Sequence, residues 1–220
     1  MKISLVNRNA FACVKFAVEV NIMEKYKGSI TREQFLFFET RTVARLLSDG
    51  MTPVEIQSEI LENNLFQFPT ERMVDNICRA CLRRLNALDD KYLISVIGSA
   101  SVSVAKQVNL YAMMRENGIV HDFMVTVIGE KYRTQNFELS KKDLNIFILE
   151  LCEQNEELAT WSDATWQKIR QVLMRCLVEC EYVDSCRSTK LNPVWITPEL
   201  LDGIHRNGDY DALAAFNCFE

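Results

Sequence analysis

The sequence predicts an all-α protein, a compact arrangement of many helices. It contains only 7 Gly and 4 Pro among 220 residues, so it has few of the residues that form the turns of an all-β fold. Apolar residues recur with a helical period along most of the chain, and several such stretches begin with a Ser or Thr that can cap a helix. Because 48% of the residues are hydrophobic and 25% are charged, the chain is expected to fold around a packed core.

The first 50 residues predict two helices. The first has one apolar face, which consists of Phe11, Val14, Val18 and Ile22. It is expected to end at Gly28, because glycine commonly terminates helices. The second helix is expected to begin with Ser29 or Thr31 as its cap and to run to Gly50.

Residues 51–88 predict a helix-turn-helix. Thr52 is a good N-cap for the first helix, and Glu55 stands at the position that completes a capping box. After a break over residues 62–69, Thr70 caps a longer helix that reaches the end of the segment. The break is longer than the turn of most helix-turn-helix proteins, which is a departure from the usual pattern.

The longer helix of this segment has two distinct faces. One face is apolar and consists of Met73, Val74, Ile77, Cys78, Cys81, Leu82, Leu85 and Leu88. The opposite face consists of Arg72, Asn76, Arg79 and Arg83. These side chains suit phosphate anchoring and base-edge contacts, so the second face is predicted to bind the major groove of DNA. A helix that simply exposes one side to water also carries a polar stripe, and this alternative stays open.

The middle of the chain, residues 91–135, predicts two or three further helices. One spans residues 104–114 and ends at Asn117 and Gly118. Another spans residues 121–132, although the succession of β-branched residues from Val125 to Ile128 lowers its helix propensity.

Residues 140–197 predict a second DNA-binding module with the element order of a winged helix. Ser140 caps one helix, and a further helix covers about residues 163–182. Residues 182–197 then predict a short β-hairpin, the wing, which Pro193 restricts to the edge of a sheet. The cations expected to face DNA lie on the recognition helix and the wing: Lys168, Arg175, Arg187 and Lys190. Here too, a merely solvated surface stays open as the alternative.

These two modules predict a division of the chain into residues 1–90 and residues 91–220. The sequence contains no internal repeat and no long linker, so the two parts are expected to pack closely, as two modules or as a single domain.

The charge and hydropathy of the chain restrict where it acts. The net charge of −5 argues against a protein that coats nucleic acid indiscriminately, but it is compatible with a local basic face. The longest charge-free apolar stretch, from Tyr92 to Ala105, is shorter than the roughly 20 residues of a membrane-spanning helix. Lys15 and Glu19 interrupt what would be the apolar region of a signal peptide. We therefore expect a cytoplasmic protein with no membrane partner.

Motifs for catalysis or cofactor binding are missing from the sequence. It has no G-x-S-x-G elbow, no glycine-rich phosphate loop, no H-E-x-x-H and only two histidines. Two cysteine pairs have the spacing of metal ligands, Cys78 with Cys81 and Cys176 with Cys180. Both pairs fall on the apolar side of predicted helices, which favours buried thiols in a reducing compartment. We therefore expect a non-enzymatic protein with no cofactor, no metal and no small-molecule substrate.

Four segments of the chain together resemble one known family. They are G-S-I-T-R-E-Q-F-L-F-F-E-T at residues 28–40, the stretch from N-N-L-F to R-R-L-N-A-L at residues 63–88, H-D-F-M at residues 121–124, and W-S-D-A-T-W-Q-K-I at residues 161–169. In this order and spacing they resemble BrxA, a family of small accessory proteins of BREX phage-defence systems in bacteria. The resemblance covers roughly residues 26 to 200.

The resemblance implies an all-helical fold similar to the NusB antitermination proteins. It also implies binding of double-stranded DNA and service beside a methyltransferase and other defence components. It implies no catalytic residues, and the DNA-contacting positions named above come from helix geometry alone. Some members of the family carry the label of inner-membrane proteins, against which the lack of a spanning segment in this sequence argues.

Two functions from different classes therefore remain at this point. The favoured one is a DNA-binding accessory protein of a BREX system. The alternative is an adaptor that holds other BREX components together without binding DNA itself, because 12 Phe and 3 Trp offer material for an apolar docking surface.

Overall fold

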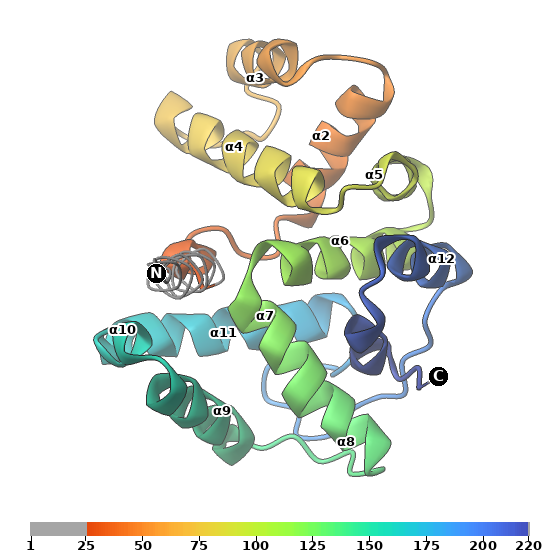
Figure 1. Cartoon of the computed structure of the whole chain (residues 1–220). Helices are drawn as coiled ribbons and strands as arrows, with labels where there is room; N and C mark the ends of the chain where they lie inside the picture. Colours follow the sequence, from red (N-terminus) through yellow and green to blue (C-terminus); the bar gives the residue numbers. More distant parts are fainter. Residues whose placement is uncertain (1–25, 220) are drawn as a thin grey trace, which may run out of the picture.

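A computed structural model describes residues 26–219, and within them it confirms the all-α prediction (Figure 1). The N-terminal helices are η1 (Gly28–Thr31), α2 (Phe37–Ser48), α3 (Pro53–Glu62), α4 (Glu71–Ala87), α5 (Lys91–Ser99) and α6 (Val102–Glu116). The remaining helices are α7 (Gly118–Asp122), η2 (Phe123–Gly129), α8 (Glu130–Arg133), α9 (Lys141–Gln154), α10 (Glu156–Ala159), α11 (Asp163–Glu179), α12 (Pro198–Asn207) and η3 (Tyr210–Phe216). The helix predicted over Phe11 to Ile22 lies outside the described residues.

Helices α2 to α5 form one group, in the upper part of Figure 1. Helix α2 packs against α4 and α5, and α3 packs against α4. The predicted starts of α3 and α4 are confirmed. Thr52 and Glu55 form the complete capping box of α3, with Pro53 in its first turn, and the Thr70 side chain accepts a hydrogen bond from the Met73 N–H.

The second predicted helix begins later than expected. The structure has a short 3-10 turn, η1, at residues 28–31, and α2 begins only at Phe37 after Leu36, whose φ is +45°. The intervening carbonyls do not enter a helical ladder, because the Arg84 guanidinium binds the carbonyl oxygens of Glu33, Gln34 and Phe35 at 3.0, 2.9 and 2.7 Å. A tertiary contact therefore sets this boundary.

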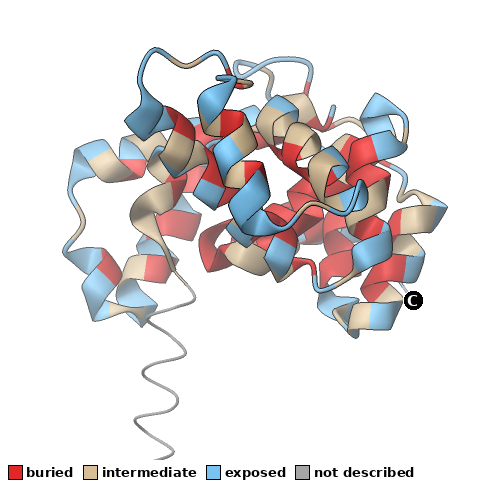
Figure 2. Ribbon diagram, turned by 90° about the horizontal axis from the view of Figure 1, so that it is seen from above, coloured by how far each residue is buried: buried red, intermediate tan, exposed pale blue. Residues whose placement is uncertain are grey.

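Helix α6 runs through the centre of the molecule and has almost no exposed side after its first turns. Its buried residues are Ala105, Val108, Asn109, Leu110, Tyr111, Ala112, Met113 and Met114. Figure 2 shows that buried residues concentrate where the helices meet, with exposed residues around the periphery. The predicted stop at Asn117 is confirmed, and the same residue caps α7 by accepting a hydrogen bond from the Ile119 N–H at 3.0 Å.

The helix predicted over residues 121–132 forms with an unusual centre. It starts at Gly118, as α7, and continues through the π-helix η2 into α8. The π-helical segment covers the β-branched run from Val125 to Ile128. A π-helix carries an extra residue per turn and is rare in proteins. Along this segment, η2 packs against the C-terminal helix η3.

The last third contains the predicted helices but not the predicted hairpin. Ser140 and Asp143 form a capping box for α9, and Ser162 caps α11. Residues 182–197 do not fold into two paired strands. Instead, a single bridge joins Lys190 to Glu138, flanked by hydrogen bonds from Leu139 N–H to Thr189 (2.7 Å) and from Leu191 N–H to Phe137 (2.8 Å).

The hairpin does not form because residues 189–191 pair with residues 137–139 and not with a second strand within residues 182–197. Leu191 and Val194 are buried, so the segment is drawn into the core rather than projecting as a wing. Pro193 has no N–H and cannot extend a ladder. The expected wing is therefore a loop that lies against the segment between α8 and α9.

The prediction of buried thiols is confirmed at all four positions, Cys78, Cys81, Cys176 and Cys180. Burial raises the pKa of the Cys81 and Cys176 thiols to about 12 each, so they stay protonated. Among residues 26–219, no helix has both the length and the apolar character to cross a membrane. The division at residue 90 stays a prediction, and hydrogen bonds cross it, such as that from Arg115 Nε to the Ala87 oxygen at 2.6 Å.

Candidate nucleic-acid interface

Helix α4 carries the first predicted set of DNA-binding residues on its outer side. Its inner side is fixed by packing against α2, α3 and α6, and Val74, Cys78, Cys81 and Leu85 are buried there. All four predicted residues are exposed or partly exposed: Arg72, Asn76, Arg79 and Arg83. Figure 1 shows α4 at the edge of the upper helix group, with its N-terminal end directed away from the other helices. The outer face of α4, defined by these four residues, is therefore open to a partner.

Arg83 is bound to two carboxylates. Its Nη2 atom lies 2.7 Å from each carboxylate oxygen of Glu33, and its Nε atom lies 3.5 Å from Glu116. The Glu116 side chain is only 8% exposed, whereas Arg83 keeps 46% of its side chain in solvent. The charge of Arg83 is therefore compensated by carboxylates, although its side chain stays accessible.

Arg79 is paired within its own helix. Its guanidinium forms an ion pair with Asp75, one turn earlier, and Asp75 also accepts a hydrogen bond from Gln57 of α3. Arg79 is 60% exposed, so this is a surface pair of the kind that contributes about 1 kcal/mol or less to stability. A phosphate can compete with a carboxylate for such a guanidinium.

Arg72 and Asn76 differ from the other two residues of the outer face. The side chain of neither residue forms a hydrogen bond or ion pair within the described part of the chain, and both residues are exposed. Two of the three arginines of the outer face, Arg79 and Arg83, are thus paired with carboxylates, Asp75 for the first and Glu33 and Glu116 for the second. The face is not a continuous positive ridge, and its uncompensated charge lies at its N-terminal end.

The second predicted set is spread over α11 and the loop that follows it. Lys168 is half-buried, and Arg175 is paired with Glu179 at 2.8 Å, which also binds Lys106 at 2.9 Å. Arg187 and Lys190 are exposed on the loop that replaces the predicted wing. The structure places these four residues on one helix and its following loop, without the hairpin that was expected to present two of them.

Arg84 is a buried arginine next to the candidate interface that helical periodicity could have identified in the sequence as facing the core. It is 1% exposed and is bound by backbone carbonyls rather than by a carboxylate. Asn109 donates to the same Phe35 carbonyl at 2.9 Å, and the Thr40 hydroxyl contacts Cys81. The signal is positional, because residue 84 lies three residues after Cys81 and so falls within the apolar face of α4. By binding the carbonyl oxygens of residues 33–35, Arg84 fixes this segment in place and so keeps the Glu33 carboxylate within reach of Arg83.

Comparison with known proteins places the chain in a family. A family model described as BrxA matches residues 24–208. A protein of Bacillus cereus (strain H3081.97) named BREX protein BrxA is 33% identical over 165 residues, which cover 75% of this chain and 82% of that protein. A protein of Escherichia coli O9:H4 (strain HS) with the same name is 27% identical over 176 residues, covering 80% and 82%.

The fold also has a counterpart among solved structures. The crystal structure of an uncharacterized protein from Magnetospirillum magneticum superimposes with a TM-score of 0.76 at 21% identity. The match covers 87% of this chain and 98% of that one, so the two share a fold over most of this chain. Taken with the family match over residues 24–208, these similarities show that the chain belongs to the BrxA family.

Proposed function

We propose that this chain is a non-enzymatic accessory protein of a BREX phage-defence system and binds double-stranded DNA through the outer face of α4. Membership of the BrxA family and the names of its relatives support the first part. Arg72, Asn76, Arg79 and Arg83 are the proposed contacts on α4. Lys168, Arg175, Arg187 and Lys190 are proposed as a secondary contribution.

The observation that carries this proposal is the accessibility of the outer face of α4. The helix is 17 residues long and firmly packed on one side, and its outer side presents residue types suited to DNA. Arg72 offers an uncompensated guanidinium, and Arg79 exchanges a weak surface pair for a phosphate at little cost. Most of the affinity should then come from phosphates, with modest sequence preference.

Replacing both Arg72 and Arg79 with Gln should weaken binding to a plain DNA duplex by roughly tenfold. The slope of the logarithm of affinity against the logarithm of salt concentration should fall by about 2, since each lost phosphate contact removes about 0.9. Fluorescence anisotropy titrations at several salt concentrations measure both quantities. Arg133→Gln combined with Lys142→Gln is the matched control, because it also removes two exposed positive charges, one on α8 and one on α9. Unchanged affinity in the double variant, with an intact circular dichroism spectrum, would exclude the outer face of α4.

Glu33→Gln should act in the opposite direction and tighten duplex binding by about threefold. The substitution removes one of the two carboxylates that compensate Arg83 and leaves the side chain nearly the same size. The same anisotropy titration measures the gain. Glu153→Gln on the exposed side of α9 changes the net charge equally at a distant helix, so it separates a local effect from a general one. Equal gains in the two variants would mean that Arg83 takes no part.

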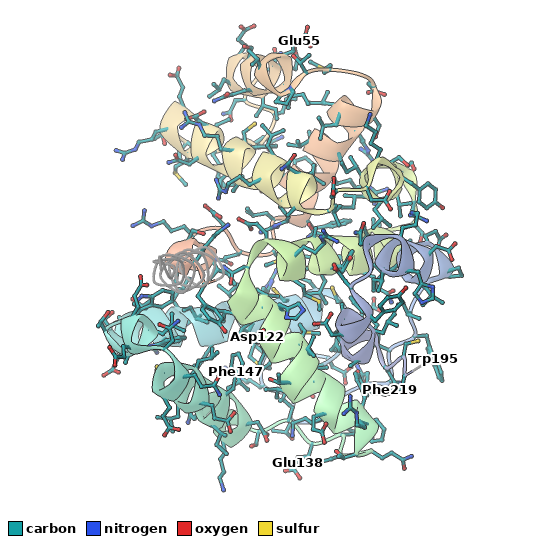
Figure 3. The ribbon with its side chains drawn as sticks, in the orientation of Figure 1. Glu55, Asp122, Glu138, Phe147, Trp195 and Phe219 are labelled. Carbon is teal, nitrogen blue, oxygen red and sulfur yellow. The ribbon has the colours of Figure 1, made fainter. Side chains whose placement is uncertain are left out.

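A second candidate function is an adaptor between BREX components. The observation that favours it is exposed apolar surface, because Trp195 is 76% exposed and Leu149 is 61% exposed. Figure 3 shows Trp195 at the edge of the molecule. The pairing of Arg79 and Arg83 with carboxylates points the same way. An adaptor predicts that DNA is retained only when a partner protein is present, with no duplex binding by the chain alone at low salt.

A further inference from the structure

Two arginines of α2 are fixed in position by the C-terminal end of α5. Arg45 donates from Nε to the Gly98 oxygen at 2.9 Å, and Arg41 donates from Nη2 to the Ala100 oxygen at 2.7 Å. The last carbonyls of a helix have no partner within the helix, so both contacts are favourable. The two guanidinium groups are therefore held one helical turn apart along α2.

Neither arginine is ion-paired with a carboxylate of the part of the chain that the structure describes. Arg79 and Arg83 of α4 both have such a partner. Within the same residues Arg45 donates only through its Nε–H, which leaves the N–H groups of Nη1 and Nη2 available. Burial lowers the pKa of Arg41, and the nearby positive charge of Arg45 lowers it further. Two positive charges thus lie side by side without an anion from the protein.

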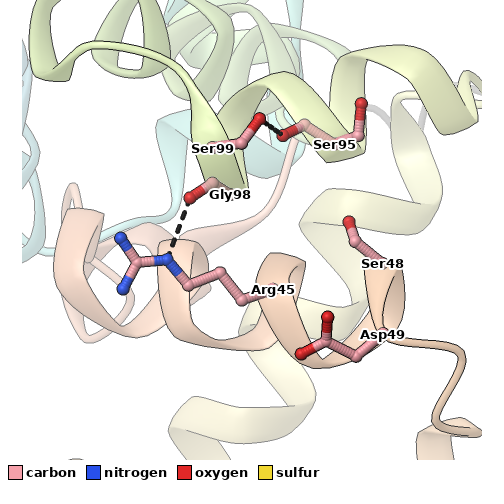
Figure 4. A pocket seen from close by; sticks show the side chains of 6 residues that line it. All are labelled: Arg45, Ser48, Asp49, Ser95, Gly98 and Ser99. Atoms are coloured by element: carbon pink, nitrogen blue, oxygen red, sulfur yellow. Dashed lines mark hydrogen bonds between the residues drawn. The ribbon is translucent and has the colours of Figure 1, made fainter.

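The available N–H groups of Arg45 lie along α2 and not in the pocket next to it. This pocket of about 400 Å³ is lined by Arg45, Ser48, Asp49, Ser95, Gly98 and Ser99. Figure 4 shows the Arg45 guanidinium at Gly98, with its Nη atoms directed away from Asp49 and the three serines. Helical side chains tilt towards the N-terminus of their helix, so these N–H groups extend towards Arg41.

An exposed aromatic ring lies on the same face of α2. Phe38 is 59% exposed, and at 100° per residue it falls within about 60° of both Arg41 and Arg45 around the helix. Residues three or four apart on a helix are neighbours, so the ring lies beside Arg41. Phe38, Arg41 and Arg45 together are called the α2 platform below. It combines an accessible ring with two guanidinium groups.

A further cation extends the platform towards α6. The Arg41 guanidinium carbon lies 5.7 Å from the centroid of the Phe37 ring, and Lys106 Nζ lies 5.6 Å from the same centroid. Lys106 is paired with Glu179 at 2.9 Å, so it contributes less net charge than the two arginines. The cationic groups therefore follow a line from Arg45 over Arg41 to the first turns of α6.

We propose that the α2 platform binds single-stranded nucleic acid. Proteins that bind single strands combine cations that follow the sugar–phosphate backbone with aromatic rings on which bases stack. Arg41 and Arg45 bind phosphates of the strand, and Phe38 stacks against an unpaired base. The bases of a duplex are stacked on one another, so their faces are not open to such a ring. The ring therefore favours a single strand over a duplex.

The platform is separate from the outer face of α4, so the proposal goes beyond duplex binding. Arg83 contacts Glu116, the last residue of α6, whereas Arg41 contacts Ala100, which precedes the first turn of α6. Helix α6 has 15 residues, so its two ends lie about 20 Å apart. Figure 1 shows α6 running across the centre of the molecule. The chain can thus hold a duplex near one end of α6 and a strand near the other.

The test is a set of fluorescence anisotropy titrations with short labelled strands at several salt concentrations. The probes are oligothymidylate and oligouridylate, which share phosphates and unpaired bases, and an abasic strand of the same length is the control without bases. Both base-containing strands should bind saturably, and the abasic strand should bind about tenfold more weakly because stacking is lost. Tighter binding of oligothymidylate assigns the platform to DNA, and tighter binding of oligouridylate assigns it to RNA.

Substitutions separate the ring from the charges. Phe38→Ala should weaken binding of the base-containing strands about tenfold and leave abasic-strand binding unchanged. Tyr210→Ala on η3 is the matched control, because Tyr210 is 62% exposed, and it should change neither. Arg45→Gln should lower the slope of the logarithm of affinity against the logarithm of salt concentration by about 0.7. Phe38→Ala removes only an exposed ring, so it gives an answer if Arg45→Gln fails to fold.

The proposed duplex binding and the α2 platform can fail independently. The double variant of Arg72 and Arg79 should leave single-strand binding unchanged while it weakens duplex binding. Phe38→Ala should leave duplex binding unchanged. Absence of saturable binding by either base-containing strand would overturn the proposal, as would an abasic strand that binds equally tightly or a Phe38→Ala variant with undiminished affinity.

Discussion

Replacing Arg84 with Met should lower the free energy of unfolding by about 3 kcal/mol. Methionine replaces the apolar stem of the arginine side chain but has no donors, so the carbonyls of Glu33, Gln34 and Phe35 lose their guanidinium partner. An unsatisfied buried acceptor costs about 1–3 kcal/mol, and partial relaxation of the segment towards water offsets some of the sum. Urea unfolding followed by circular dichroism measures the change.

The neighbouring residue is the natural control for this prediction. Arg83→Met removes an arginine at the adjacent position of the same helix, but its side chain is 46% exposed and bound only through ion pairs. Because Glu33 and Glu116 keep only 17% and 8% of their side chains exposed, the cost of Arg83→Met should reach about 1–2 kcal/mol and stay below that of Arg84→Met. If the two variants lose equal stability, the carbonyl contacts of Arg84 do not stabilise the fold in the way described.

Replacing Gly129 with Val should cost about 3 kcal/mol through overpacking. A Cβ atom at Gly129 would lie 2.9 Å from the Ala214 Cβ and 3.2 Å from the Ala214 carbonyl carbon and oxygen. These atoms belong to the backbone or its first side-chain atom, so they cannot turn aside, and η2 and η3 must separate. For a protein of this length the melting temperature should drop by about 2–4 °C for each kcal/mol, as measured by thermal unfolding.

A matched substitution and a rescue sharpen this test. Thr126→Val places the same side chain on the exposed side of the same π-helix and should change stability by only about 0.5 kcal/mol. Adding Ala214→Gly to Gly129→Val removes the closest contact and should restore part of the loss, which a double-mutant cycle quantifies. Strictly additive effects of Gly129→Val and Ala214→Gly would show that the two residues do not meet.

The features predicted correctly from the sequence are those that depend on neighbouring residues. Thr52, Thr70 and Ser140 cap helices because each side chain reaches a backbone N–H three residues later. The start of α2 could not be predicted in this way, because it depends on Arg84, some 50 residues further along the chain. The missing hairpin has the same kind of cause, since Lys190 pairs with Glu138.

The candidate site shows the same limit. Helical periodicity correctly places Arg72, Arg79 and Arg83 on the solvent side of α4. It carries no information about Glu33 and Glu116, which lie on other segments and compensate Arg83 only after folding. The distribution of charge on a helix face is therefore a tertiary property, even where the composition of that face is local.

The π-helix between α7 and α8 has a consequence for how chain length can vary in relatives. In a regular α-helix, deleting one residue turns every later side chain by about 100° around the axis. Within residues Phe123–Gly129 the extra residue per turn provides slack, since a deletion there can be absorbed by conversion to α-helical geometry. Lys131, just beyond this segment, then keeps its orientation towards Asp143, so evolution can shorten the chain here without rotating α8 about its axis.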